Sequence, residues 1–470
     1  MTPEVEIKFA CGPETLEALA VRAAQVPGKD RRLVSVYYDT PDRALASRGA
    51  SLRLRTDGTG RTVQTFKTGE GLGRLEAEVE TAPGRLELAG AELGALLPPD
   101  DLSRLSPRFT VQVRRRTFEV AHGSSRIELA LDAGEIQAGN ARETICEAEL
   151  ELISGAPGDL FDLALGWVSE LPLALSLRSK SGRGDRLAGG DGRHERLPPG
   201  QTCGEVVRRA LLGALSGTCE RVLEAAADPA PEAVHGLRVA LRRQRSLMAV
   251  FRSRLEPGET AATRRGLRTL SQACSLAREL DVLIAEADPA GALHVELSAA
   301  RKKAAAGLVQ TLESAAARRT LLEALILTES GDWRGRPENT RPAGDLLGDL
   351  ARRWRQVRRL GARFDVLDAG ERHDLRLRIK ALRYVLEGLD AAELAELRRV
   401  LSPALRDAQD ALGADNDGEA ARSRLEALDL SRTARREAAR LVARLRRKGA
   451  RARAGRAVRR LLEAGAGPLT

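Results

Sequence analysis

Residues 146–152 read CEAELEL, an unbroken alternation of apolar and acidic side chains. Successive side chains of a β-strand point to opposite faces, so Glu147, Glu149 and Glu151 would share one face and the apolar residues the other. On one isolated strand, such a charged row is usually a solvent-exposed face. The segment therefore predicts a strand with one apolar and one acidic face.

The same alternation recurs between residues 4 and 155, with turn residues between the segments. Further examples are 4–9 (EVEIKF), 51–55 (SLRLR), 76–80 (EAEVE) and 126–131 (RIELAL). The pattern predicts an antiparallel sheet, with helices near 12–25 and 158–170. Solvent exposure alone does not explain so many strands with a charged face. If the sheet closes into a barrel, the charged faces meet in a polar interior, and helices or a partner cover the apolar faces.

Charges of both signs in that interior restrict its chemistry. Carboxylates in this number suit a hard divalent cation, most simply Mg²⁺ or Mn²⁺. Arginine and lysine suit a polyanion, because a guanidinium binds phosphate oxygens in pairs. A metal and a polyanion together indicate phosphoryl transfer. The region has one histidine, His122, with no serine–histidine pair and no glycine-rich Walker loop.

Seven short motifs follow one another in this half of the chain. They are ExExK at 4–8, YYDTP at 37–41, LRLR at 52–55, FKT at 66–68, RLEAE at 74–78, IELALDAG at 127–134 and SKSG at 179–182. Their order and spacing, through residue 187, resemble the CYTH superfamily of triphosphate tunnel proteins. That family includes inorganic, thiamine and RNA triphosphatases and some adenylyl cyclases.

The resemblance implies a role for each charged group. The metal would be held by Glu4, Glu6, Asp132, Glu147 and Glu149. The phosphates would be cradled by Lys8, Arg53, Arg55, Lys67, Arg74, Arg115 and Lys180, with Glu76 and Glu78 beside them on the strand of Arg74. Catalysis would rest on Glu4, Glu6, Lys8, Arg53, Arg55 and Lys67. The run Arg114-Arg115-Arg116 leaves the register open by one residue, and a slip would put a different arginine inside.

Composition changes sharply near residue 190. Residues 1–190 carry a net charge of −4 and residues 191–470 one of +14, within a total of +10. Glycine and proline gather between 181 and 204, as in an interdomain linker, and long Ala/Leu/Arg helices follow. The fold expected is α+β: a tunnel barrel over 1–187, a linker over 188–202 and an all-α helical bundle over 203–465.

One basic pattern occurs twice in the helical half. Residues 235–245 (HGLRVALRRQR) and 373–383 (HDLRLRIKALR) both carry basic or imidazole groups at offsets 0, 3, 7 and 10, which share a helix face. The groups are His235, Arg238, Arg242, Arg245, His373, Arg376, Lys380 and Arg383. An acidic segment follows each helix (277–281 and 406–413) and could orient the arginines. A repeated row favours an extended polyanion over a merely solvated face. Aromatic residues form only 3% of the chain, so base stacking on nucleic acid is the weaker reading.

The two histidine helices and their acidic followers resemble the CHAD domain, a helical domain found beside CYTH domains and on polyphosphate granules. The likeness spans roughly 203–465 and is weaker between 284 and 350. It implies that this half binds polyphosphate. Residues 431–460 carry thirteen basic residues against one acidic, which fits either a granule-binding tail or a solvated helix.

These observations predict a metal-dependent inorganic triphosphatase that converts tripolyphosphate to pyrophosphate and phosphate, joined to a polyphosphate-binding domain. One alternative is the same fold acting on an organic triphosphate such as thiamine triphosphate. Another is a non-catalytic polyphosphate-granule protein, which a cluster of carboxylates argues against. Five scattered cysteines, no Cys-x-x-Cys, no signal peptide and no apolar run of membrane-spanning length predict a cytoplasmic protein, with granule association an open option.

Overall fold

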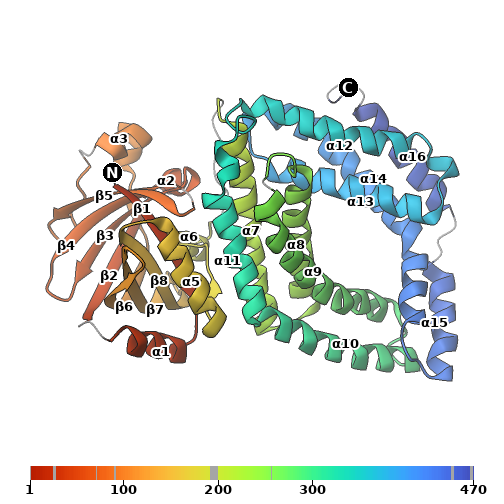
Figure 1. The fold of residues 1–470 in the computed structure, drawn as a ribbon, viewed down its shortest axis with the longest axis horizontal. Coiled ribbons are helices and arrows are strands. Elements are labelled where there is room, and N and C mark those ends of the chain that lie inside the picture. The colour runs from red at the N-terminus through yellow and green to blue at the C-terminus, as the bar shows by residue number, and fades with distance from the viewer. Residues whose placement is uncertain are drawn as a thin grey trace. The chain divides into compact units, whose positions relative to one another are not determined.

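In the computed structural model of this chain, the residues described are 2–24, 28–69, 71–88, 91–190, 200–255, 257–445, 449–465 and 469. They form two compact units, Met1–Glu195 and Arg196–Thr470, and each unit is described by itself (Figure 1). Residues 191–199 of the expected linker lie outside the described part. Among the described helices, none combines the length and the hydropathy needed to cross a membrane.

The first unit is a closed antiparallel barrel of eight strands, as the alternation predicted. The strands are β1 (Thr2–Ala10), β2 (Lys29–Asp39), β3 (Ala50–Asp57), β4 (Thr62–Thr68), β5 (Gly73–Thr81), β6 (Ser106–His122), β7 (Ser125–Ala138) and β8 (Ala141–Ser154). Their order is β5-β4-β3-β2-β6-β7-β8-β1, and β1 also pairs with β5, which closes the ring. A short strand, β9 (Ala174–Leu175), pairs with the end of β1.

Helices cover the outer apolar faces of the strands. The two expected helices are present as α1 (Pro13–Ala23) and α5 (Pro157–Glu170), beside β6 to β8. Phe9 and Leu150 lie under this cover and are fully buried. Three short helices, α2 (Ala44–Ser47), α3 (Ala91–Leu96) and α4 (Pro99–Ser103), were not expected from the sequence. Leu45 of α2 and Leu93 of α3 belong to one apolar cluster with residues of β3 and β4, on the outer face.

Another apolar cluster lies inside the barrel. It contains Leu33, Tyr37, Phe109, Val111, Val113, Ile136, Ala138 and Ile145, and the end of helix α6 (Lys180–Leu187) packs against it. Val113 has the same strand parity as Arg115, and Ile145 the same as Glu147, so this cluster shares the interior with the charged residues. A Cβ built on Gly184 of α6 would lie 2.2 Å from the ring of Phe109, so only glycine allows this approach.

Helix α6 was not expected from the sequence. Residues 181–187 begin the Gly/Pro-rich stretch 181–204, yet they are helical and belong to the barrel unit. The helix is stabilised at its start, where the Ser179 hydroxyl accepts a hydrogen bond from Gly182 N at 3.1 Å. Burial of Lys180 and Gly184 supplies tertiary contacts that outweigh the poor helix propensity of glycine.

The second unit is all-helical, as predicted. Its helices are α7 (Cys203–Ala227), α8 (Pro231–Val250), α9 (Pro257–Glu286), α10 (Ala292–Leu312), α11 (Ala315–Ser330), α12 (Leu346–Gly361), α13 (Ala369–Gly388), α14 (Ala395–Glu426), α15 (Arg432–Leu445) and α16 (Ala450–Ala464). Short 3₁₀ turns occupy Asp332–Gly335, Ala343–Asp345, Phe364–Val366 and Ala392–Leu394. The repeated motifs lie on α8 and α13, which pack against each other, and each is followed by a long helix, α9 and α14 (Figure 1).

The apolar stripes of α8 and α13 form the core between these helices. Leu237 and Leu241 of α8 and Leu375 and Ile379 of α13 are fully buried. Because the basic residues occupy an adjacent stripe, packing of the apolar stripes leaves the basic rows beside the contact between the two helices. The tail is also folded, since α15 packs its alanine and leucine face against α9, α10 and α14.

Candidate functional site

Strand register brings the acidic residues of the barrel together. Arg115 of β6 lies directly opposite Asp132 of β7, which in turn lies opposite Glu147 of β8. Lys8 of β1 lies opposite Glu149 of β8. Direct cross-strand partners point to the same side of a sheet, so these side chains share the barrel interior. Asp132, Glu147 and Glu149 are each at most 6% exposed.

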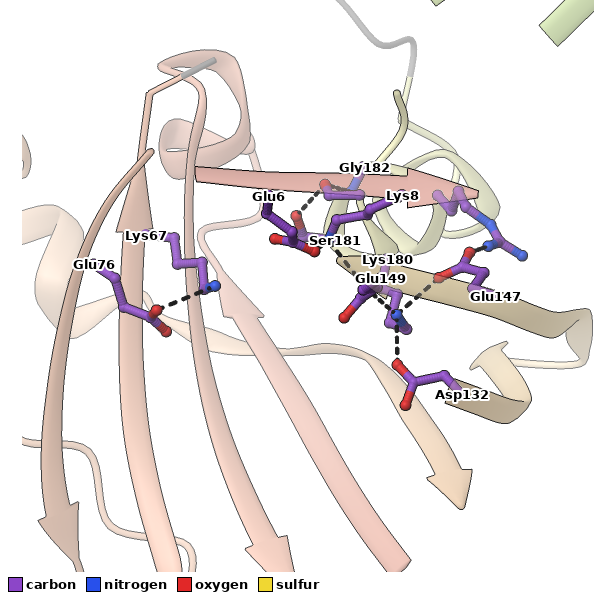
Figure 2. A network of polar contacts seen from close by, with 12 residues as sticks. Glu6, Lys8, Lys67, Glu76, Asp132, Glu147, Glu149, Lys180, Ser181 and Gly182 are labelled. Atoms are coloured by element: carbon purple, nitrogen blue, oxygen red, sulfur yellow. Dashed lines mark hydrogen bonds and ion pairs between the residues drawn. The ribbon is translucent and has the colours of Figure 1, made fainter. Parts of the chain in front are cut away.

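Lys180 is the centre of this cluster (Figure 2). It is the first residue of α6, and its Nζ lies 2.8 Å from Asp132 Oδ2, 2.8 Å from Glu147 Oε2 and 2.7 Å from Glu149 Oε1. The other lysine beside the cluster, Lys8, lies 3.1 Å from Glu149 and 2.7 Å from Glu6. Three carboxylates therefore surround one buried ammonium group.

Arg115 forms the second cationic support of the cluster. Its Nε donates to Asp132 Oδ1 at 2.7 Å, and its Nη2 donates to Glu149 Oε2 at 2.5 Å. Burial opposes ionisation of Glu149, but Lys180, Lys8 and Arg115 outweigh it and hold the pKa of Glu149 well below its usual value. Burial likewise opposes ionisation of Asp132, but Lys180 and Arg115 lower its pKa, so Asp132 and Glu149 are both arranged to stay charged.

The neighbours of Arg115 point outward. Arg114 Nη2 lies 2.5 Å from Asp30 Oδ2, and Arg116 Nη2 lies 2.8 Å from Glu17 Oε1 of α1. The register left open by three consecutive arginines is thus the one that puts Arg115 inside.

A second wall of the interior is predominantly cationic. Lys67 of β4 forms an ion pair with Glu76 of β5, which Figure 2 shows as a dashed line. Lys67 Nζ lies 3.3 Å from Glu76 Oε2, and Arg53 of β3 lies 3.9 Å from the other oxygen of Glu76. Arg53 also donates to Tyr37 Oη at 3.3 Å. Glu78, farther along β5, accepts a hydrogen bond from the Thr65 hydroxyl at 2.9 Å and lies at the exposed end of the row.

Arg55 differs from the other interior cations. Burial and the like charges of Arg53 and Arg115 lower the pKa of Arg55 to about 10. No carboxylate or other acceptor among the described residues pairs with its guanidinium. Arg74 of β5 similarly has a buried Nε without a described hydrogen-bond acceptor. Its positive charge opposes protonation of the nearby Lys8. Among the described side chains, neither guanidinium thus has an ion-paired carboxylate, although Glu78 attracts Arg55 from farther away.

Among the described side chains named here, which do not include that of Glu4, the two walls differ in charge balance. Four carboxylates (Glu6, Asp132, Glu147 and Glu149) face four cations (Lys8, Arg115, Lys180 and Arg183). Four cations (Arg53, Arg55, Lys67 and Arg74) stand beside two carboxylates (Glu76 and Glu78) on the other wall. Sequence reasoning missed Arg183, which pairs with Glu147 and lies 2.6 Å from Glu143. Its spacing of three from Lys180 on one helix could have revealed it.

The carboxylate group fits a divalent metal in its donor chemistry. Carboxylate oxygens are the ligands that Mg²⁺ and Mn²⁺ prefer. Glu6 Oε1 and Glu147 Oε2 are buried and accept no hydrogen bond, although each lies within ion-pair distance of a lysine. No set of three ligating side chains, within the part of the chain described, has the arrangement of a formed metal site. The Glu4 side chain, also expected as a ligand, lies outside the described residues.

In the helical unit, residues of the two basic rows lie close enough to lower one another's pKa values. Burial and the charges of Arg242, Arg376, Arg238 and Arg383 lower the pKa of Lys380 to about 7. The pKa values of His235 and His373 are lowered as well, by burial and by nearby cations from both rows. Groups 138 residues apart in sequence thus repel one another across α8 and α13.

Arg383, Arg245 and Arg238 have polar partners on neighbouring helices. Arg383 Nε donates to Gln409 at 3.0 Å, Arg245 donates to the Ser271 hydroxyl at 2.9 Å, and Arg238 lies 3.8 Å from Glu279. One residue of each acidic segment therefore reaches the rows, Glu279 through its carboxylate and Gln409 through its amide oxygen. Asp281 instead holds Arg301, at 2.5 Å.

Helix α9 adds basic residues that the repeat did not indicate. The charge of Arg278 lowers the pKa values of His235 and Arg238, and the charges of Arg264 and Arg268 lower the pKa of Arg245. Arg268 follows Arg264 by 4 residues and Arg278 follows Arg268 by 10. These spacings place all three on one face of a helix, so the sequence could have indicated them. Within the described part of the chain, no carboxylate forms an ion pair with Arg242, Lys380, Arg264, Arg268 or Arg278. The described part of this surface is therefore strongly positive, although Glu279 and Glu387 lie beside Arg238 and Arg383.

Comparison with known proteins agrees with this division. Residues 2–177 match the CYTH domain family, and residues 209–426 match the CHAD domain family. An inorganic triphosphatase of Haemophilus influenzae is 31% identical over 192 residues, which cover 39% of this chain and 54% of that protein. The chain thus spans about half the length of this curated relative.

Two solved structures resemble the separate halves. A putative adenylyl cyclase from Hippeastrum, described as having dominant triphosphatase activity, is 20% identical and covers 41% of this chain and 100% of its own, with a TM-score of 0.33. The CHAD domain from the plant Ricinus communis is 20% identical and covers 58% of this chain and 94% of its own, with a TM-score of 0.49.

Proposed function

Because this chain joins an N-terminal CYTH domain to a C-terminal CHAD domain, we propose that it is a metal-dependent inorganic triphosphatase that also binds polyphosphate. The observation that carries the proposal is Arg55, a guanidinium enclosed in the barrel with which no described carboxylate forms an ion pair, in an interior that also holds a cluster of buried carboxylates. Unpaired buried charge is costly, so a protein that retains it is organised for a charged ligand.

The interior residues divide the work between them. Arg53, Arg55, Lys67 and Arg74 would bind the phosphate oxygens of tripolyphosphate, and Lys8 and Arg115 lie between this wall and the carboxylates. Glu6, Asp132, Glu147 and Glu149, with Glu4, would hold Mg²⁺ or Mn²⁺. When bound, the metal supplies charge compensation for the phosphates and activation of water. The fixed guanidinium groups stabilise charge as it redistributes toward pyrophosphate and phosphate.

An inorganic substrate is favoured over an organic triphosphate. The aromatic rings found in the interior, Tyr37 and Phe109, stack on each other with centroids 4.6 Å apart. They are therefore already partnered and embedded in an apolar cluster with α6. The related Haemophilus influenzae protein is named an inorganic triphosphatase, which supports the same choice.

The CHAD half would bind longer polyphosphate over α8, α9 and α13. Its support is the charge on Arg242, Lys380 and the arginines Arg264, Arg268 and Arg278 of α9, with which no described carboxylate forms an ion pair. A linear polyphosphate supplies regularly spaced negative charge along such a surface. A cytoplasmic location, with association to polyphosphate granules, forms part of this proposal.

The test is phosphate release by the full chain from tripolyphosphate, pyrophosphate, ATP and thiamine triphosphate, each with Mg²⁺, Mn²⁺ or EDTA. We expect rapid release from tripolyphosphate, little from pyrophosphate, and none with EDTA. A preference for thiamine triphosphate would replace the inorganic substrate. No release under any condition, together with retained polyphosphate binding, would favour the non-catalytic granule protein.

A further inference from the structure

The carboxylate cluster already holds a cation, the ammonium of Lys180. An ammonium has three N–H donors, and three carboxylates from β7 and β8 lie 2.7–2.8 Å from Lys180 Nζ (Figure 2). The side chain is 8% exposed, so the arrangement excludes most solvent. The cage of Asp132, Glu147 and Glu149 is thus occupied by a lysine.

A divalent cation bound to the same three carboxylates would compete for this position. Two positive charges at such short range repel strongly in a buried site, so the ammonium and the metal cannot both be central. Lys180 is the member of the cluster best suited to leave. Its charge sits on a flexible four-carbon stem, whereas Arg115 is fixed by hydrogen bonds from two of its nitrogens to Asp132.

We propose that Lys180 is the built-in counter-ion of the substrate-free site, and that a triphosphate opens the cage to metal by attracting the Lys180 ammonium to its own oxygens. This inference rests on the proposed function and adds an order of events to it. Metal would bind weakly while Lys180 is caged and more tightly once an anionic substrate engages Lys180. By thermodynamic linkage, metal would strengthen substrate binding by the same factor.

The decisive experiment is a titration of the full chain with Mn²⁺ alone, with free Mn²⁺ followed by electron paramagnetic resonance and no phosphate present. Lys180→Met should bind Mn²⁺ roughly tenfold more tightly than the unaltered chain, because three carboxylates lose their competitor. Lys8→Met is the matched control, since it removes the same charge from the same cluster but leaves Lys180 in the cage. It should tighten binding far less. Equal effects of the two variants would reduce the proposal to general electrostatics and overturn it, as would unchanged affinity in Lys180→Met.

A second measurement needs no variant and so does not depend on the folding of Lys180→Met. Lysines of the unaltered chain are acetylated with acetic anhydride, with and without saturating Mn²⁺, and mapped by mass spectrometry. Modification of Lys180 should rise with Mn²⁺, while that of Lys67, on the opposite wall, should stay constant. Mn²⁺ binding without any change at Lys180 would overturn the exchange. Neither measurement uses hydrolysis, so failure of the triphosphatase activity would be recognised separately.

Discussion

At the scale of single residues, strand parity decides which charges act. Arg114, Arg115 and Arg116 are chemically identical and consecutive, yet only the middle one reaches Asp132 and Glu149. The motifs place an arginine here but cannot choose among three. The choice depends on the pairing of β6 with β7, because a one-residue slip moves every side chain to the other face. The interior position of Arg115 is therefore a property of the folded sheet.

This contrast gives a controlled prediction. Arg115→Ala should lower kcat for tripolyphosphate by at least about a hundredfold, since its charge would be lost beside the reacting phosphates. Arg114→Ala and Arg116→Ala should keep near-normal rates, because their partners are exposed on the outer face. Steady-state kinetics of the three purified variants decide the matter. Equal losses in all three would show that surface charge, not the interior, governs the rate.

A carboxylate of the cage provides the next prediction. Glu149→Gln keeps the shape of the side chain but removes a charge that Lys8, Arg115 and Lys180 all contact. We expect most activity to be lost with saturating Mg²⁺, because the amide is a poor ligand for a hard cation. Circular dichroism should verify that the barrel remains folded. A normal rate in Glu149→Gln would remove this residue from the metal site.

Lys380 predicts a pH dependence for polyphosphate binding. Its pKa lies near 7 in the free protein, and a bound anion would raise it, so binding takes up a proton. Affinity should therefore be highest below pH 7 and fall between pH 7 and 8.5, by up to roughly tenfold per pH unit. Lys380→Arg, which stays charged, should bind with little pH dependence in that range.

His235 and His373 titrate at lower pH, because their pKa values are lowered from 6.5. The same slope in Lys380→Arg would exclude Lys380 as its source.

At the scale of elements, regular patterns were readable from the sequence and local exceptions were not. The alternation in 146–152 predicted β8, and the 3.6-residue period predicted α8 and α13, because burial imposes these periods. Helix α6 was missed because its glycines disfavour a helix in isolation, and it forms where Gly184 packs against Phe109. The barrel closes where β1 pairs with β5, and paired residues such as Glu4 and Arg74 are 70 positions apart in sequence, so a local pattern could not reveal this pairing. The basic face of α9 was overlooked because it has no partner in the repeat.

The basic rows can be tested as elements against a matched charge pair. Arg238→Glu with Arg242→Glu should weaken polyphosphate binding far more than Arg436→Glu with Arg440→Glu on α15. Both pairs have a spacing of four on one helix, so the net charge and geometry of the changes are equal. Arg436 and Arg440 are exposed, and their attraction is screened by salt, whereas Arg238 and Arg242 act within a converging cationic surface. Isothermal titration with long-chain polyphosphate measures both. Equal losses would contradict a dedicated surface.

At the scale of the whole molecule, charge separates the two units as clearly as fold does. Residues 1–190 sum to −4 and residues 191–470 to +14. The interior cations of the barrel, such as Arg53, Arg55 and Lys180, are enclosed, so ionic strength has little access to them. In the helical unit the cations lie on a surface, where salt competes directly with a polyanion. The units should therefore respond differently to salt, although we propose a phosphate ligand for both.

Two fragments, residues 1–190 and 200–470, would make this separation measurable. The first should retain tripolyphosphate hydrolysis, because its barrel, its helix α6 and all proposed catalytic groups lie within one compact unit. The second should bind long-chain polyphosphate without releasing phosphate, with affinity falling steeply between about 50 and 200 mM salt as counterions compete. KM of the first fragment should change much less over the same range. An inactive but folded 1–190 fragment would mean that the helical unit contributes to the reaction. Equal salt dependence in both fragments would mean that the barrel binds its substrate through exposed charge, and Arg55 would then lose its proposed role.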